Sequence, residues 1–188
     1  MATKDHKSEP IESASETLQR IFDGHGSVLG SQMADESSRY DVLKKTDFPK
    51  PQRTRRIAVA NQKGGVGKTT STVNTAAALA NKGAQVLVID MDPQGNASTA
   101  LGVSHASGEP SVYDVIEGRS DLGDVITVCP DFPTLDVVPA SIDLSGAELE
   151  VADLPNRNTL LKEALDLYLR QSDKHYDYVF IDCPPSLG

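Results

Sequence analysis

The sequence of 188 residues is poor in cysteine and in aromatic residues, and it contains no tryptophan. The two cysteines, Cys129 and Cys183, exclude a disulfide-stabilised scaffold, and neither has a second Cys or a His at the spacing of a structural zinc site. Aromatics make up 5 % of the residues against 38 % hydrophobic residues overall, so any core must be built from Val, Leu, Ile and Ala. The longest apolar run is 76–80, far below the roughly 20 residues of a membrane span, and residues 1–15 lack the apolar stretch of a secretory signal. We therefore expect a cytoplasmic protein without a membrane contact.

Charge of one sign dominates, because the formal net charge is −9. Residues 1–48 carry six basic and nine acidic side chains, and residues 49–56 carry four basic side chains and no acidic one. Residues 57–188 carry eight basic and eighteen acidic side chains, which gives this part a net charge of −10. An acidic field of this kind repels nucleic acid, so we expect duplex DNA binding by this chain to be weak or absent.

The first 56 residues are predicted to lie outside the folded domain. Ser, Glu, Asp and Lys dominate residues 1–50, which predicts a disordered or weakly helical tail. Within it, residues 13–22 combine a capping box with apolar positions on one helical face, which predicts either a transient helix or one that faces a partner, and we favour the transient helix. Residues 51–56 form a basic linker, or else an arm that contacts phosphates; the linker is the simpler interpretation.

Residues 57–188 show short apolar segments that alternate with helical patterns. The predicted strands are 57–60, 86–90, 125–128, 135–138 and 178–182, and the predicted helices are 70–82, 111–117, 145–151 and 158–171. The segment 57–60 is apolar at every position, which is typical of a parallel strand buried on both faces. The alternation predicts an α/β fold with a mostly parallel sheet flanked by helices.

A glycine-rich turn follows the first predicted strand and precedes a predicted helix. Glycines allow backbone amides to surround phosphate oxygens, and the helix directs its positive end to the same point. In this loop Lys68 can reach the β- and γ-phosphates, and the Thr69 hydroxyl can bind Mg²⁺. The strict phosphate-loop pattern requires Gly at position 62, where this chain has Gln62, so the match is imperfect. The predicted nucleotide-binding residues are Gly64, Gly65, Val66, Gly67, Lys68, Thr69 and Thr70.

Two other predicted strands also end in acidic residues. Asp90 and Asp92 follow the second strand at a spacing that directs both side chains the same way, and by themselves they are equally typical of an ordinary turn. The last strand ends in Asp182, which is typical of a Walker B carboxylate that holds Mg²⁺ through a water. Cys183 is adjacent but has no base partner, so a structural role is predicted for it. Because ligands bind at the carboxyl ends of parallel strands, these residues are expected to meet.

Five segments together resemble the ParA/Soj-type partitioning ATPases, which belong to the deviant Walker A group of P-loop ATPases. They are KGGVGKTT, DMDPQGNASTALG, SVYDVI, LDVVPASIDLSGAE and YDYVFIDCPPSLG, and the resemblance covers about residues 55–188. It implies a P-loop NTPase fold that is incomplete at the C-terminus, because members of the family continue beyond the last segment. The missing part would supply later strands, much of the adenine pocket and most of the basic surface that binds DNA. In the family fold the strand 57–60 lies between the Walker B strand and one of those later strands, so without the later strand we expect 57–60 to form an exposed edge of the sheet.

The resemblance also implies a mechanism and partners. It assigns ATP and Mg²⁺ as cofactors, Lys63, Lys68 and Asp92 as catalytic residues, and Thr69, Asp90 and Asp182 as residues of the magnesium site. Lys63 would reach the phosphates of the partner in an ATP-dependent homodimer, and Asp92 would orient the attacking water. A ParB-type centromere-binding protein, non-specific DNA and association with the nucleoid are implied for the full-length family. Slow ATP hydrolysis in chromosome or plasmid partition is thus the predicted function; the alternatives are a non-hydrolysing nucleotide- or partner-binding fragment and a related positioning ATPase.

Overall fold

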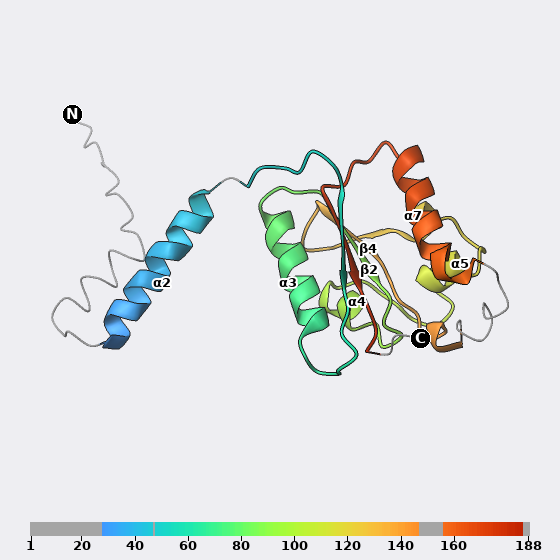
Figure 1. Ribbon diagram of the computed structural model, residues 1–188, viewed down its shortest axis with the longest axis horizontal. Coiled ribbons are helices and arrows are strands. Elements are labelled where there is room, and N and C mark those ends of the chain that lie inside the picture. Colours follow the sequence, from blue (N-terminus) through green and yellow to red (C-terminus); the bar gives the residue numbers. More distant parts are fainter. Residues whose placement is uncertain (1–27, 47, 147–155, 186–188) are drawn as a thin grey trace, which may run out of the picture. The chain divides into compact units, whose positions relative to one another are not determined.

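The computed structural model describes residues 28–46, 48–146 and 156–185 and divides the chain into two compact units, Met1–Phe48 and Pro49–Gly188. Helix α2 (Val28–Lys45) belongs to the first unit (Figure 1). The strands of the second unit are β1 (Arg55–Val59), β2 (Val86–Asp90), β3 (Thr127–Val128), β4 (Leu135–Val138) and β5 (Tyr178–Asp182). Its helices are α3 (Lys68–Asn81), α4 (Asn96–Ala100), α5 (Val112–Ile116) and α7 (Leu160–Gln171), with 3₁₀ turns at Leu122–Val125 and Arg157–Thr159. No helix among the described residues is both long and apolar enough to cross a membrane.

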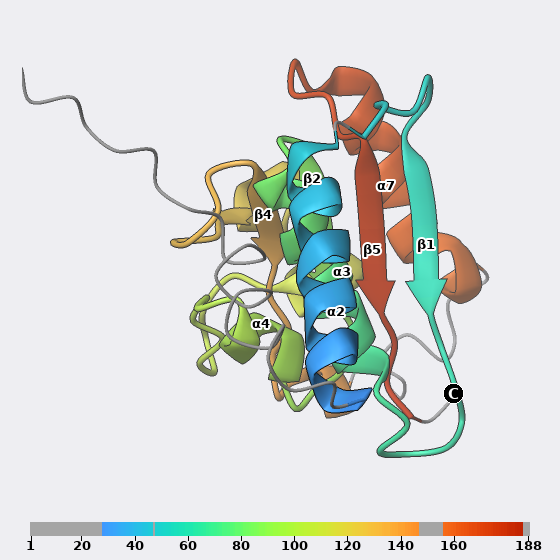
Figure 2. The ribbon, with the colours of Figure 1, turned by 90° about the vertical axis from the view of Figure 1, so that its left-hand side faces the viewer.

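The five strands form one sheet in the order β1-β5-β2-β4-β3. Strands β1, β5, β2 and β4 are parallel to their neighbours, whereas β3 pairs antiparallel with β4 through only two residues. Figure 2 shows β5 between β1 and β2. The order of the strands in the sheet differs from their order in the sequence. Parallel neighbours cannot be joined by a tight turn, so the chain crosses over the sheet between them, and helices lie in these crossovers. The prediction of a mostly parallel α/β sheet is confirmed.

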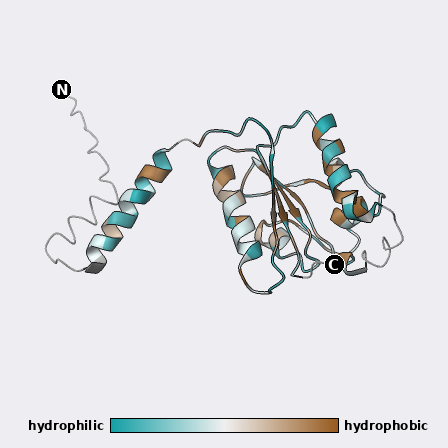
Figure 3. Cartoon of the chain, in the orientation of Figure 1, coloured by the Kyte–Doolittle hydropathy of each residue, from teal (hydrophilic) through white to brown (hydrophobic). Residues whose placement is uncertain are grey.

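Helices cover both faces of this sheet, with α3 on one side and α5 and α7 on the other (Figure 1). Successive side chains of β2 alternate between the two layers: Val86 and Val88 pack with α3, while Leu87 and Ile89 pack with α5 and α7. All four are completely buried, and Figure 3 shows the strands as the most hydrophobic part of this unit. Burial on both faces explains why this strand has no polar position before its last residue.

The first strand lies where the resemblance predicts. Strand β1 pairs with β5, the strand that ends in Asp182, and its other side is unpaired among the described residues. The apolar pattern of 57–60 taken by itself predicts burial on both faces, and that part of the prediction is wrong. Four of its five residues are exposed, and Ile57 keeps 36 % of its surface accessible. The strand also begins earlier, at Arg55, because Arg55 and Arg56 continue the pairing with Tyr178 and Val179. Two of the six residues of the predicted basic linker, Arg55 and Arg56, are therefore strand.

Several other elements differ from the sequence predictions. Helix α2 occupies a region that the sequence analysis assigned to a tail, and α4 was not predicted. Of the predicted strand 125–128, only Thr127–Val128 is a strand, since the preceding residues form a 3₁₀ turn. Residues 144–146 are helical, but the rest of the predicted helix 145–151 and the whole of the predicted helix 13–22 lie outside the described residues.

Candidate nucleotide-binding site

The ends of three strands meet at one edge of the sheet. Asp182 at the end of β5 pairs with Val59 at the end of β1 on one side and with Asp90 at the end of β2 on the other. The loop after β1 therefore begins next to Asp182, and Asp90 lies one strand further, although more than 85 residues separate Asp90 from Asp182 in the sequence. Sheet register alone produces this convergence, as expected for parallel strands.

The loop between β1 and α3 surrounds a cavity of about 600 Å³. Gly65 and Gly67 adopt left-handed backbone conformations with φ of 70° and 86°, which residues with a side chain rarely adopt. Gly67 is also the N-cap of α3, so the free amides of the helix start in this loop. The residues that line the cavity are Gly64, Gly65, Val66, Gly67, Lys68, Thr69, Thr70, Val73, Asn74, Asp92, Asn96, Ala100 and Pro185.

The electrostatics of this cavity favour an anion. Lys68 and the N-terminal residues of the fourteen-residue helix α3, where the positive end of the helix dipole lies, line the same cavity. All seven predicted nucleotide-binding residues line the cavity. Lys63 does not line it: the residue is exposed, and its backbone N–H donates to Asn61 Oδ1 at 3.0 Å, which shapes the start of the loop. The cavity has the charge and the open glycine surface that a polyphosphate requires.

Asp182 is completely buried and only half satisfied. Its Oδ1 atom lies 3.1 Å from the hydroxyl of Thr72, which is also within 3.0 Å of the Lys68 carbonyl oxygen. Its Oδ2 atom is buried and has no hydrogen-bond partner among the described residues. A buried carboxylate oxygen without a partner is costly, so this atom is available for a ligand. Asp182 itself does not line the cavity.

Asp90 is equally buried, but both of its oxygens are bonded. Oδ1 accepts the backbone N–H of Asp92 at 3.1 Å, and Oδ2 accepts both the N–H and the hydroxyl of Ser98 at 2.8 Å. Burial raises the pKa of Asp90, and the neighbouring Asp182 adds to that rise, while the three hydrogen bonds oppose it. The residue faces α4 and not the cavity.

Asp92 is the acidic residue that faces the cavity. Its Oδ1 atom accepts the N–H of Gln94 at 3.0 Å, which holds the side chain over the turn that leads to α4. The expectation that Asp90 and Asp92 point the same way is wrong. The extended chain ends at Asp90, and the next residues turn, with Gly95 N–H donating to the Asp92 carbonyl oxygen at 2.8 Å.

Comparisons with known proteins agree with this geometry. Residues 54–188 match the model of a family described as AAA domain. The chain is 48 % identical over 132 residues to the sporulation initiation inhibitor protein Soj of Bacillus subtilis and 47 % identical over 132 residues to the chromosome partitioning protein ParA of Caulobacter vibrioides. The chain belongs to the ParA/Soj-type group of this AAA-domain family. It covers about half the length of these relatives, 50 % of Soj and 48 % of ParA, while the matches span 70 % of this chain.

Solved structures show the same fold. A cobyrinic acid a,c-diamide synthase from Mycobacterium smegmatis with bound ADP and magnesium is 41 % identical, with a TM-score of 0.65 over 72 % of this chain and 53 % of that one. A plasmid partition protein from Borrelia burgdorferi is 28 % identical, with a TM-score of 0.61 over 72 % of this chain and 58 % of that one. These matches place the chain among the P-loop NTPases.

The ParA/Soj-type site also contains residues that the sequence analysis missed. Thr72 lies one helical turn after Thr69 and bridges α3 to β5, and Ser98 bridges α4 to Asp90. Asn74 and Asn96 line the cavity. The spacing of Thr72 from Lys68, four residues along one helix face, was the available sequence signal; for Ser98 there was none, because α4 was not predicted.

The residues present fit Mg²⁺ as the family's metal. The unpartnered Asp182 Oδ2 atom is a hard oxygen ligand of the kind that Mg²⁺ or its waters prefer, and Thr69, whose side chain carries a second such oxygen, lines the cavity. Asp90 fits less well as a ligand because both of its oxygens are bonded to other residues. Among the described residues no group of three His, Cys, Asp or Glu side chains could hold a metal by itself, so the phosphates would have to share the ion.

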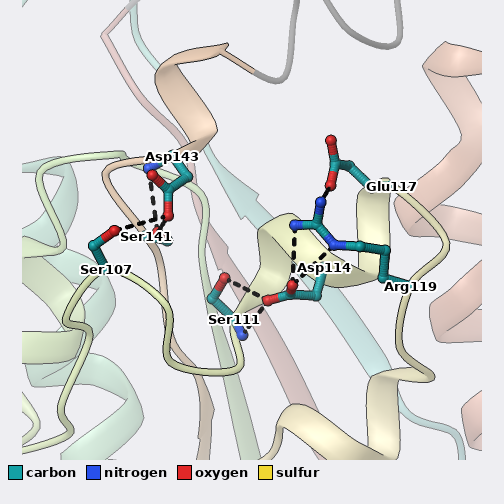
Figure 4. Close-up of polar contacts among 7 residues, drawn as sticks. All are labelled: Ser107, Ser111, Asp114, Glu117, Arg119, Ser141 and Asp143. Atoms are coloured by element: carbon teal, nitrogen blue, oxygen red, sulfur yellow. Dashed lines mark hydrogen bonds and ion pairs between the residues drawn. The ribbon is translucent and has the colours of Figure 1, made fainter.

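A second, smaller cavity of about 160 Å³ lies near α5. Figure 4 shows that its polar groups bind one another: Ser111 donates to Asp114, Arg119 bonds Asp114 and Glu117, and Ser107 and Ser141 donate to Asp143. The acidic residues Glu109, Asp114 and Asp143 line this cavity with Arg119 as their only basic neighbour in the lining, so it does not favour an anion as the larger cavity does. Cys183, next to Asp182, has a pKa raised by burial and by that carboxylate, so its thiol is protonated at neutral pH.

Proposed function

We propose that this chain binds ATP with Mg²⁺ in the cavity of the glycine-rich loop and hydrolyses it. The observation that carries the proposal is the convergence of Lys68, the N-terminus of α3 and Asp92 on one cavity beside Asp182. The relative from Mycobacterium smegmatis, solved with ADP and magnesium, supports the choice of ligand. The cavity is large enough for a nucleotide, since such pockets measure ~300–1,000 Å³.

The chemistry follows from where charge develops. A water oxygen forms a bond to the γ-phosphorus while the bond from that phosphorus to the bridging oxygen of ADP breaks, so negative charge spreads over the phosphate oxygens. Lys68 and the loop amides stabilise that charge, and Asp92 orients the water and accepts its proton. When bound, Mg²⁺ neutralises further charge on the β- and γ-phosphates.

The biological role that this supports best is chromosome or plasmid partition, because Soj of Bacillus subtilis, ParA of Caulobacter vibrioides and the plasmid partition protein of Borrelia burgdorferi are similar to the chain. In that role the protein forms an ATP-dependent homodimer in which Lys63 contacts the partner's phosphates. Its exposed position at the start of the loop, outside the cavity of its own chain, supports this assignment. A ParB-type protein would be the partner that resets the ATP-bound state.

Two substitutions separate nucleotide binding from hydrolysis. Lys68→Ala should abolish ATP binding in calorimetric titration with Mg²⁺, because the charge on the phosphates is lost and no other lysine lines the cavity. Asp92→Ala should leave the affinity within a few-fold and reduce turnover by about 10²-fold or more. Lys162→Ala, on α7, is the matched control and should change neither.

The turnover of the unsubstituted chain distinguishes the proposed ATPase from the alternative, a non-hydrolysing nucleotide- or partner-binding module. A nucleotide-binding module would bind ATP in a Lys68-dependent manner but show no turnover in the unsubstituted chain, with or without a ParB-type protein and DNA. Unchanged ATP affinity in Lys68→Ala would contradict both the ATPase and the nucleotide-binding module, and would favour the partner-binding module.

A further inference from the structure

A completely buried serine on α4 connects three segments of the site. The Ser98 hydroxyl donates to Asp90 Oδ2 at 2.8 Å and accepts the backbone N–H of Ala140 at 3.2 Å, and the Ser98 N–H donates to the same Asp90 oxygen at 2.8 Å. One side chain thus connects the end of β2, helix α4 and the segment after β4. None of these groups contacts the cavity directly, since neither Ser98 nor Asp90 lines it.

The connection continues from Asp90 to Asp92. The other oxygen of Asp90 accepts the Asp92 N–H at 3.1 Å, so the backbone at Asp92 depends on where the Asp90 carboxylate points. Gly95 restricts the same turn, because a Cβ atom added there would lie 2.5 Å from the His105 ring. Asp92 is thereby held by a fixed Asp90 on one side and a tight glycine turn on the other.

We propose that Ser98 is a positioning residue for Asp92, acting through Asp90; this inference rests on the proposed ATPase function. The Ser98 hydroxyl holds the Asp90 carboxylate in the orientation whose second oxygen accepts the Asp92 amide. Asp90 thus acts on the loop that carries the reactive carboxylate and not as a direct ligand of the metal. Without the hydroxyl, the backbone N–H of residue 98 remains as the one hydrogen bond to Asp90 Oδ2, and the bridge to the Ala140 N–H is lost. Asp90 then turns more freely, and the Asp92 carboxylate is less well placed toward the γ-phosphate.

The chain contains a matched control for this arrangement. Ser111 is also buried, and its N–H and hydroxyl bond one oxygen of Asp114 at 2.9 and 3.1 Å, in the same pattern as Ser98 and Asp90 (Figure 4). That pair caps α5 and makes no hydrogen bond to the loop of Asp92. Ser111→Ala therefore removes the same kind of contact without touching the proposed connection.

The first measurement needs no nucleotide. In the full chain without ATP, Ser98→Ala should accelerate hydrogen exchange of the Asp92 amide by about tenfold, the effect of one ordinary hydrogen bond, while Ser111→Ala leaves this amide unchanged. Ser98→Cys, whose thiol is a weak donor, should fall between wild type and Ser98→Ala and serves as the second variant if Ser98→Ala does not fold. The inference would be overturned if the exchange rate of the Asp92 amide is the same in wild type and in both Ser98 variants. It would also be overturned if Ser111→Ala accelerates this exchange as much as Ser98→Ala does.

The second measurement is steady-state ATP turnover. Ser98→Ala should lower kcat about tenfold and leave KM for ATP within twofold, because phosphate binding by Lys68 and the loop is intact. A parallel rise in KM, or equal losses in Ser98→Ala and Ser111→Ala, would assign Ser98 to general stability and contradict the proposal. If wild type shows no turnover, the proposed function fails, while the exchange experiment still decides the connection.

Discussion

Three aspartates lie at one edge of the sheet in three different environments. Asp182 is buried with one unpartnered oxygen, Asp90 is buried with both oxygens bonded, and Asp92 faces the cavity. Burying an ionised carboxylate without hydrogen bonds is costly, so each environment restricts what its residue can do. The neighbours, and not the residue type, distinguish the three proposed roles: a carboxylate at the metal site, one that positions a loop, and one that orients the attacking water.

The residue scale yields a prediction for Thr72. Thr72→Val keeps the shape of the side chain but removes the hydroxyl that lies 3.1 Å from Asp182 Oδ1. Because Asp182 Oδ2 has no partner among the described residues, neither oxygen of the buried carboxylate is then hydrogen-bonded by a side chain of this part of the protein. We expect a loss of about 1–3 kcal/mol in the free energy of unfolding without ligand, measured by urea denaturation. Thr134→Val, which removes a partly buried hydroxyl bonded to the Ala80 carbonyl oxygen, should cost less because no charge is left unpaired. Equal losses in the two variants would contradict the account of Asp182.

At the scale of elements, an ion pair connects α7 to the exposed edge strand of the sheet. The carboxylate of Asp166 on α7 accepts hydrogen bonds from Lys162 of the same helix, at 2.9 Å, and from Arg56 of β1. The hydrogen bonds from Lys162 and then from Arg56 lower the pKa of Asp166 from 3.8 to about 2. The pair with Arg56 crosses from strand to helix, so it joins two elements that are 110 residues apart.

This pair predicts a pH dependence with a definite sign. The folded-state pKa of Asp166 lies below its ordinary value, so the pair stabilises the fold fully above about pH 4 and the contribution disappears as the pH falls toward about 2. Asp166→Asn should thus lower the thermal midpoint at pH 6 and lose most of that difference at about pH 2. Arg56→Gln should show the same pattern, and the double variant should be no worse than either single one. Additive effects at pH 6 would show that the two side chains do not interact.

At the scale of the whole molecule, charge decides the response to DNA. The part from residue 57 onward has a net charge of −10, and each released counterion requires a basic contact with a phosphate. We expect weak or undetectable duplex binding at physiological salt in a mobility-shift assay, with or without ATP. Tight binding under these conditions would contradict this expectation, and neutral substitutions of Lys50, Arg53, Arg55 and Arg56 would then test the basic segment as its source.

The exposed edge of the sheet predicts self-association. Strand β1 is paired on one side only among the described residues, and an unpaired edge is a template for another strand. Arg55 and Arg56 belong to the strand and oppose such pairing, so the risk is concentrated at the apolar residues from Ile57 to Val59. Light scattering over a concentration series should show association of the chain that Ile57→Lys reduces. Leu167→Lys on α7, at a similarly exposed apolar position, should have no effect, and equal suppression by both would point to general solubility.

The sequence by itself determined the class of fold and the phosphate-binding loop. Both depend on local patterns: β2 is apolar at every position but its last, and the glycines of residues 64–67 precede a helix with Lys68 at its start. Such patterns determine backbone conformation within a few residues, so the strands at 86–90, 135–138 and 178–182 were predicted with their observed bounds. The seven loop residues line the cavity for the same reason.

Only the tertiary structure decided the surroundings of each acidic residue, and it shows β1 exposed although the pattern of this strand is apolar. Sheet order places β1 at an edge, which its apolar sequence does not indicate, and the turn after Asp90 separates the directions of Asp90 and Asp92. The partners of Asp90 and Asp182 come from Ser98 and Thr72, on helices that reach them only when the crossovers have closed. A hydrogen bond between residues far apart in the chain has no local pattern, because it depends on how whole elements pack; the roles of these carboxylates were therefore decided by packing.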